Sequence, residues 1–162
     1  MKKLTLTTEK VLAAFNVLSS AKYGKLDDAD KIKVWKITRK LKPVAEKFDD
    51  DSKDAAEKMK PSEDFDERLA RAQEYERTVK QTDFDASKLP MGAAEYGKFI
   101  EEFKAYQKLV NDTISDFAKK EVEVEIETLS EDAFGKLMAS NDWNMAQVTG
   151  LGDIICGNTE EK

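Results

Sequence analysis

The chain has 162 residues, of which 37% are charged and 40% hydrophobic, and its mean hydropathy is -0.63. This length suits one domain, and the polar balance is ordinary for long helices that expose a wide charged face. Histidine is absent from the sequence, which removes the side chain that most often serves as general base and metal ligand. We therefore expect a non-enzymatic protein with no cofactor and no metal.

Two features of the sequence bear on its compartment. No run of residues approaches the roughly 18 apolar positions that a membrane-spanning helix needs, and residues 1–10 lack the apolar stretch of a signal peptide. Cys156 is the only cysteine, which excludes an internal disulfide and is typical of a reducing compartment. These features predict a soluble, cytoplasmic protein without a membrane partner.

Charge is distributed unevenly along the chain. Residues 1–81 hold 19 basic and 16 acidic residues, residues 82–162 hold 8 basic and 17 acidic residues, and the net charge is -6. Such asymmetry either marks a partner for one half or reflects two halves that complement each other inside one fold. The second interpretation is favoured here.

The N-terminal residues predict a strand followed by a helix. Lys3–Thr7 alternates polar residues with Leu4 and Leu6, as a half-buried strand does. Thr8 is the expected N-cap of the first helix, and Gly24 is its expected end because glycine tolerates the left-handed cap conformation.

The second predicted helix is longer and begins at Asp27 and Asp28, whose charges suit its positive end. Apolar residues recur on one face at a spacing of three or four, and the strongest of them are Val34, Ile37, Leu41, Val44 and Phe48. Pro43 interrupts this pattern and predicts a kink near residues 39–42.

A third helix is expected after Pro61, with ion pairs between residues four apart. These pairs are Asp64 with Arg68 and Glu67 with Arg71. Residues 81–92 are expected to form a loop with room for a third strand.

A further long amphipathic helix is predicted to fill most of Met91–Leu129 and to run directly into a strand. Its apolar seam repeats over about three heptads and consists of Tyr96, Phe99, Phe103, Tyr106, Val110 and Phe117. From residue 121 to 127 the period falls to two, so glutamates line one face of a strand. We expect the seam to be buried against other helices and the strand to pair with Lys3–Thr7.

Ser130 and Asn144 are the expected N-caps of two short C-terminal helices. The predicted organisation is a single domain over residues 1–156 and a frayed tail over residues 157–162.

The row of glutamates is the sharpest local feature, and it comprises Glu121, Glu123, Glu125 and Glu127. Side chains two apart on a strand lie about 7 Å apart on one face. Such a row is able to bind Ca²⁺ or a basic partner, or to supply two carboxylates for glycoside hydrolysis. A solvated face opposite the apolar residues is the favoured interpretation.

A second candidate surface is the basic stretch that holds Trp35, Lys36 and Arg39. Its cations would contact phosphates and its indole would stack on a base. Charged residues also flank the two apolar seams with opposite sign, namely Lys33, Lys40 and Lys47 on the second helix and Glu95, Glu102 and Asp116 on the helix at 95–117. Flanking charges of this kind select a helix partner, so pairing within the chain or in an oligomer is favoured over nucleic acid.

The order of segments resembles small proteins of tailed phages and prophages. The residues that carry this resemblance are an N-terminal helix with Val11, Leu12, Phe15 and Leu18, a Lys-rich helix from Asp30 to Phe48, and the C-terminal segments EVEVEIETL, LSEDAFGKLM and WNMAQVTGLGDII. The resemblance implies a virion-associated or cytoplasmic assembly role and transfers no catalytic residue.

Together these patterns predict a mainly α fold with a small sheet (α+β), arranged as an elongated helical bundle or hairpin with two or three strands at one end. The predicted function is a non-enzymatic interaction or assembly protein that acts through helix faces, with a protein partner or a second copy and no small-molecule substrate. The alternative is an acidic regulator or inhibitor that mimics nucleic acid to occupy a basic protein site.

Overall fold

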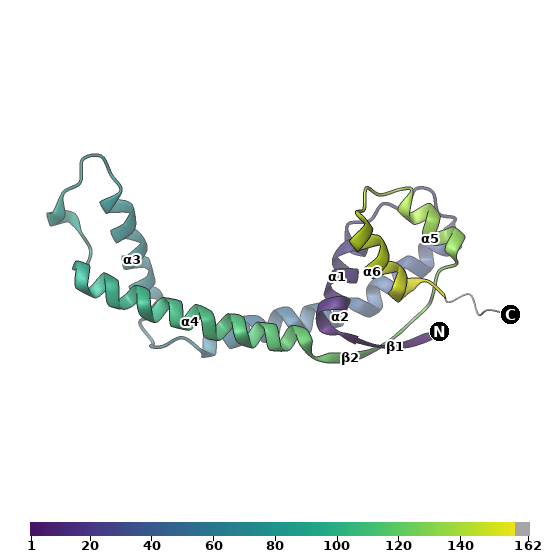
Figure 1. Ribbon diagram of the computed structural model, residues 1–162, viewed down its shortest axis with the longest axis horizontal. Coiled ribbons are helices and arrows are strands. Elements are labelled where there is room, and N and C mark those ends of the chain that lie inside the picture. Colours follow the sequence, from purple (N-terminus) through teal and green to yellow (C-terminus); the bar gives the residue numbers. More distant parts are fainter. Residues whose placement is uncertain (158–162) are drawn as a thin grey trace. The chain divides into compact units, whose positions relative to one another are not determined.

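The computed structural model describes residues 1–157, and within that range it contains six α-helices and a two-stranded sheet (Figure 1). The elements are β1 (Lys2–Thr7), α1 (Thr8–Ser19), α2 (Asp28–Lys58), α3 (Phe65–Val79), η1 (Ala86–Lys88), α4 (Ala93–Lys119), β2 (Glu121–Ile126), α5 (Glu131–Met138) and α6 (Met145–Ile155). The predicted mainly α fold with a small sheet is confirmed. None of the described helices is both long and apolar enough to span a membrane.

The chain divides into two compact units. One comprises Met1–Asp51 and Asp116–Lys162, and the other comprises Ser52–Ser115, so the boundaries fall inside α2 and α4. Each unit has an apolar core of its own. A single domain over residues 1–156 stays a prediction, and the predicted tail lies outside the described residues except for Gly157.

The sheet of the first unit joins the N-terminal strand to a late segment, as predicted. β1 and β2 are antiparallel, with Lys3 opposite Glu125 and Thr5 opposite Glu123. The other face of the sheet is apolar, because the side-chain period of a strand is two. Val124 and Ile126 on that face are buried in the core.

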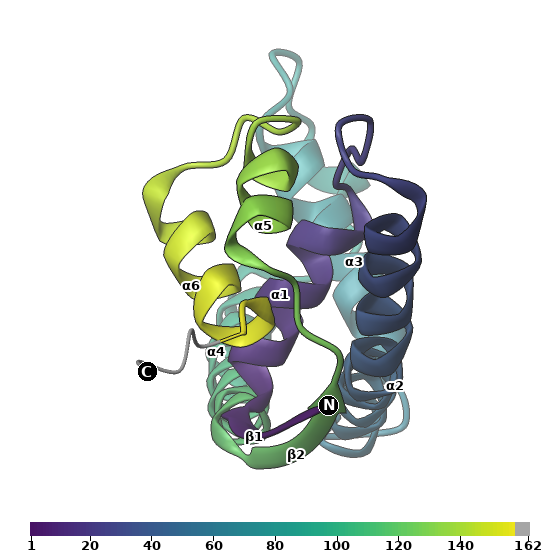
Figure 2. The same cartoon turned by 90° about the vertical axis from the view of Figure 1, so that its right-hand side faces the viewer.

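Four helices supply the rest of this core. Figure 2 shows α1 between α2 and α6, with α5 above α6 and the sheet below. The most deeply buried side chains of this core come from all of these elements and include Val11, Leu18, Val34, Ile37, Leu41, Leu137, Leu151 and Ile155. The predicted apolar face of the second helix is thus confirmed at its first three positions, each of which is inaccessible to solvent.

Three of the predicted helix caps are confirmed. The Asp27 carboxylate accepts a hydrogen bond from the Asp30 amide, and the Ser130 hydroxyl accepts one from the Ala133 amide. Asn144 forms a reciprocal capping box with Gln147.

The two predictions for the ends of α1 are wrong. Thr7 is the N-cap, whereas Thr8 uses both its amide and its hydroxyl to donate to the Lys120 carbonyl, at 2.8 and 2.9 Å. The helix ends at Ser19, whose hydroxyl bonds back to the Phe15 carbonyl. Gly24 has no positive φ, so the turn after α1 does not use the conformation that favours glycine.

An aromatic cluster from α3 and α4 forms the core of the second unit. The Phe65 ring lies 5.7 Å from that of Phe99 and 4.8 Å from that of Tyr106, and Tyr75 stacks on Tyr96 at 4.3 Å. Phe99 and Phe65 are 1% and 2% exposed, and the other rings of the cluster are partly buried. Burial of the predicted seam against another helix is therefore confirmed in this unit.

The ion pairs predicted within the third helix are replaced by pairs between helices. Arg68 binds Glu102 at 2.6 Å, and Arg71 lies 3.3 Å from Glu95. Packing of Phe65 against α4 turns the arginines of α3 toward the acidic flank of that helix. Two of the lysines that flank the seam of α2, Lys33 and Lys47, pair with neighbours in their own helix, Asp30 and Asp51.

Two further predictions concern residues 81–92 and the helix around Pro43. No third strand forms in residues 81–92, which hold η1 and a turn in which Asp85 accepts from the Ser87 amide. α2 continues as a helix through Pro43, and the kink stays a prediction.

The aromatic cluster generates the first prediction. Phe99→Ala should lower the free energy of unfolding by about 3–5 kcal/mol, because it leaves a cavity beside Phe65. Leu109→Ala is the control, since Leu109 is 53% exposed on the same helix and its loss should cost under about 0.5 kcal/mol. Urea denaturation followed by circular dichroism measures both, and equal losses would contradict the assigned core.

Candidate functional site

Trp35 on α2 is the most exposed aromatic side chain of the described residues. Its neighbours along the helix, Val34 and Ile37, are fully buried, whereas Trp35 is 58% exposed and Ile32, one turn earlier, is 53% exposed. The helical period places these two side chains on the flank of α2 that the core does not cover. Large apolar groups in this position are available to a partner.

Two cationic side chains of α2 surround the exposed indole: Arg39 lies over its ring, and Lys36 forms an ion pair with a glutamate beside the sheet. The Arg39 guanidinium lies 5.3 Å from the centre of the Trp35 ring, one turn along the helix. Lys36 Nζ lies 2.8 Å from Glu127 Oε1, which follows the end of β2. The bond joins two segments that are 91 residues apart in sequence.

A surface hollow of about 470 Å³ lies between these groups. Its lining combines α2, the end of β2 and the N-terminal residue, namely Met1, Trp35, Lys36, Arg39, Lys40, Glu125 and Glu127. We call these residues together with Ile32 the Trp35 surface. The structure thus brings Glu125 and Glu127 of the glutamate row together with the candidate residues Trp35, Lys36 and Arg39, which the sequence suggested separately.

The other two glutamates of the row lie elsewhere. Glu121 borders a different hollow, with Pro43 and Phe117, and Glu123 is exposed opposite Thr5. Among residues 1–157, no three His, Cys, Asp or Glu side chains are grouped so that they could hold a metal ion. The four glutamates therefore do not line one common hollow among the described residues.

The ion pair sets the electrostatics of the Trp35 surface. The hydrogen bond from Lys36 holds the pKa of Glu127 below the usual range of a glutamate, and Lys33 adds to the effect.

The lone cysteine, Cys156, lies outside the Trp35 surface, and burial raises the pKa of its thiol. This thiol is therefore a weak nucleophile at neutral pH.

Sequence reasoning missed an apolar groove between α1 and α6. Its volume is about 380 Å³, and Ala13, Val17, Leu151 and Ile154 lie on its walls. The only signal in the sequence is the number of small residues on both helices, such as Gly150. That signal is weak because small residues also allow helices to pack closely.

Comparison with protein-family models, curated proteins and solved structures found no match to this chain.

The Lys36–Glu127 pair generates the second prediction. Lys36→Met should raise the pKa of Glu127 toward the ordinary value of a glutamate, because the hydrogen bond from Lys36 is its largest cause of depression. Since the folded-state pKa is depressed, the pair stabilises the fold above the unfolded-state pKa of the glutamate. That contribution is lost as pH falls through the folded-state pKa.

An NMR titration of the Glu127 side chain measures this shift. Lys40→Met is the control, because it removes a cation from the same hollow and leaves the hydrogen bond in place. Equal pKa values of Glu127 in the wild type and Lys36→Met would show that the ion pair does not form in solution.

Proposed function

We propose that this chain is a non-enzymatic interaction or assembly protein that binds a protein partner through the Trp35 surface. The single observation that carries the proposal is the exposed indole of Trp35, held by Arg39 beside a hollow of mixed charge. Trp and Arg are the residues most enriched among those that dominate binding energy at protein interfaces. A ring already fixed by a neighbouring cation loses little conformational freedom on binding.

The charges around the indole favour a protein over a nucleic acid. Lys36, Arg39 and Lys40 would attract phosphates, but Glu125 and Glu127 line the same hollow and would repel them. A protein partner that presents both signs of charge fits this arrangement. A second copy of the chain meets that description as well as another protein does.

The alternative function, mimicry of nucleic acid by the acidic half, has less support. Mimicry needs a continuous acidic face, whereas Glu127 is paired with Lys36 and Glu125 lies opposite Lys3. The resemblance of the sequence pattern to small phage and prophage proteins supports assembly on or near a virion.

The third prediction tests the Trp35 surface. Trp35→Ala should weaken partner binding by about 30-fold or more, because truncation of a central interface residue commonly costs 2 kcal/mol or more. Phe84→Ala is the matched control, since Phe84 is an aromatic residue that is 49% exposed in the other unit. Affinity capture from a host extract, with light scattering of the purified protein for self-association, measures the effect.

The salt dependence separates the two functions. Binding that buries the indole should persist at high salt, whereas charge mimicry is screened. A monomer that recovers no partner, or a partner retained equally by the wild type and Trp35→Ala, would overturn the proposal.

A further inference from the structure

The outer edge of β1 is an open strand edge. The sheet has two strands within the described residues, so β1 is hydrogen-bonded on one side alone. The Thr8 amide donates to the Lys120 carbonyl, which fixes Thr8 and Lys120 as a bonded pair of the ladder. Bonded and non-bonded pairs alternate in antiparallel strands. The amide and carbonyl groups of Lys3, Thr5 and Thr7 therefore point away from β2, where no other described strand meets them.

The apolar face of the sheet is incompletely covered at this edge. Leu4 on β1 is partly exposed, whereas its cross-strand partner Val124 on β2 is buried. Leu6 is also partly exposed and lines the groove between α1 and α6. Leu4 and Leu6 therefore both leave apolar surface at the edge of β1, next to the partly exposed Val122 of β2.

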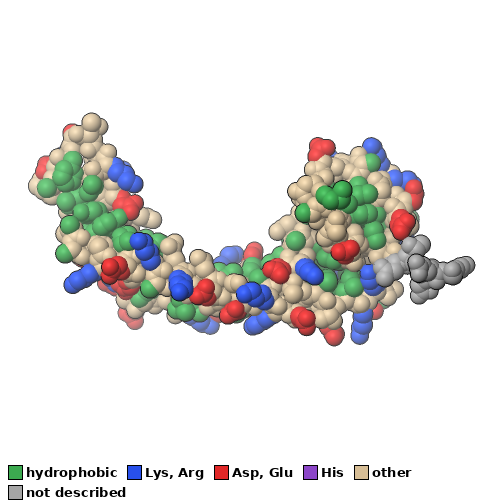
Figure 3. All heavy atoms as spheres, viewed as in Figure 1, with side chains coloured by type: hydrophobic (Ala, Val, Ile, Leu, Met, Phe, Trp, Pro, Cys, Tyr) green, Lys and Arg blue, Asp and Glu red, His purple; other side chains and the backbone are tan. Residues whose placement is uncertain are grey.

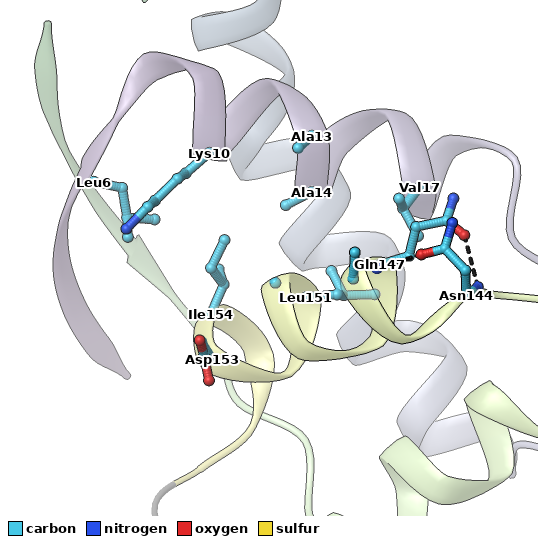
Figure 4. Close-up of a pocket in the computed structure, with 12 residues that line it drawn as sticks. Leu6, Lys10, Ala13, Ala14, Val17, Asn144, Gln147, Leu151, Asp153 and Ile154 are labelled. Atoms are coloured by element: carbon cyan, nitrogen blue, oxygen red, sulfur yellow. Dashed lines mark hydrogen bonds between the residues drawn. The ribbon is translucent and has the colours of Figure 1, made fainter. Parts of the chain in front are cut away.

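The groove continues this uncovered surface. Figure 4 shows Leu6 at the end of the groove nearest the sheet, with Ala13 and Val17 on α1 and Leu151 and Ile154 on α6. Its volume of about 380 Å³ is enough for several aliphatic side chains. In Figure 3, apolar side chains show on the surface of this part of the molecule.

The charged residues near the open edge of β1 favour acidic side chains on a strand that would bind there. Lys3 stands on the solvent face of β1, and Lys10 lies at the rim of the groove, while Asp153 is the one acidic residue among those that line it. On its paired side, β1 already faces acidic residues, with Lys3 opposite Glu125 and Thr5 opposite Glu123. A strand on the open side with acidic residues on its solvent face would repeat this favourable pairing.

We propose that the open edge of β1 and the α1–α6 groove together bind an extended peptide segment that alternates apolar and acidic residues. The backbone of the segment would extend the sheet by one strand, its acidic side chains would lie beside Lys3 and Lys10, and its apolar side chains would cover Leu4 and Leu6 and enter the groove. This surface shares no lining residue with the hollow at Trp35, so the inference goes beyond the proposed function and stands without it.

A fluorescein-labelled peptide of sequence EVEVEI, which copies β2, is the probe for the fourth prediction. Its fluorescence anisotropy should rise saturably with the full-length protein. Gly150→Leu should weaken this binding at least about tenfold, because the new side chain fills the groove. A Cβ at Gly150 meets nothing within 4 Å, and leucine favours a helix more than glycine does, so the variant is expected to fold.

Gly97→Leu is the matched control, because Gly97 also lies in a helix with open space around its Cβ and belongs to the other unit. It should bind the peptide as the wild type does. Lys10→Glu should weaken binding of EVEVEI and strengthen binding of the reversed-charge peptide KVKVKI.

Amide hydrogen exchange locates the bound strand. Addition at the open edge should protect the amides of Lys3, Thr5 and Thr7, while those of Leu4 and Leu6 keep their protection from β2. The absence of saturable binding, equal binding by Gly150→Leu, or loss of protection at Leu4 and Leu6 would overturn the proposal. Dimers of the free protein that Gly150→Leu abolishes would also overturn it, because a second copy would then occupy this edge.

Discussion

The pairing of β1 with β2 is the constraint on which the first unit depends. It joins residues 2–7 to residues 121–126, and Thr8 extends it with two hydrogen bonds to the Lys120 carbonyl. Closing so long a loop costs conformational entropy, which the burial of Val124 and Ile126 helps to offset. Directly after β2, Leu129 bonds to Ile155 and Gly157, so the same segment also fixes the end of α6.

The two faces of β2 explain why core and candidate site lie close together. Alternation directs Val124 and Ile126 into the core and Glu125 toward solvent. The helical period of α2 likewise directs Ile37 into the core and Trp35 toward solvent. Where these two elements meet, Glu127 binds Lys36, and the Trp35 surface forms at the junction of their uncovered faces.

The second unit shows how packing selects ion pairs among several that the sequence allows. Arg68 is four residues from Asp64, and a pair within the helix was the simplest expectation. Instead, Arg68 binds Glu102 and its guanidinium lies 5.2 Å from the centre of the Phe99 ring. Burial of Phe65 against α4 fixes the rotation of α3, and that rotation decides which carboxylate the arginine reaches.

Local patterns in the sequence were sufficient for the main helices and the two strands, although not for the ends of α1. The change of period after Lys119, the acidic strand and the caps at Asp27, Ser130 and Asn144 depend on neighbours within a few residues. The partners of Arg68 and Lys36, the meeting of Trp35 with Glu125 and Glu127, and the groove at Gly150 were decided only by the tertiary structure. Each depends on which helix face turns toward which neighbour, and that choice is set by the packing of residues far apart in the chain.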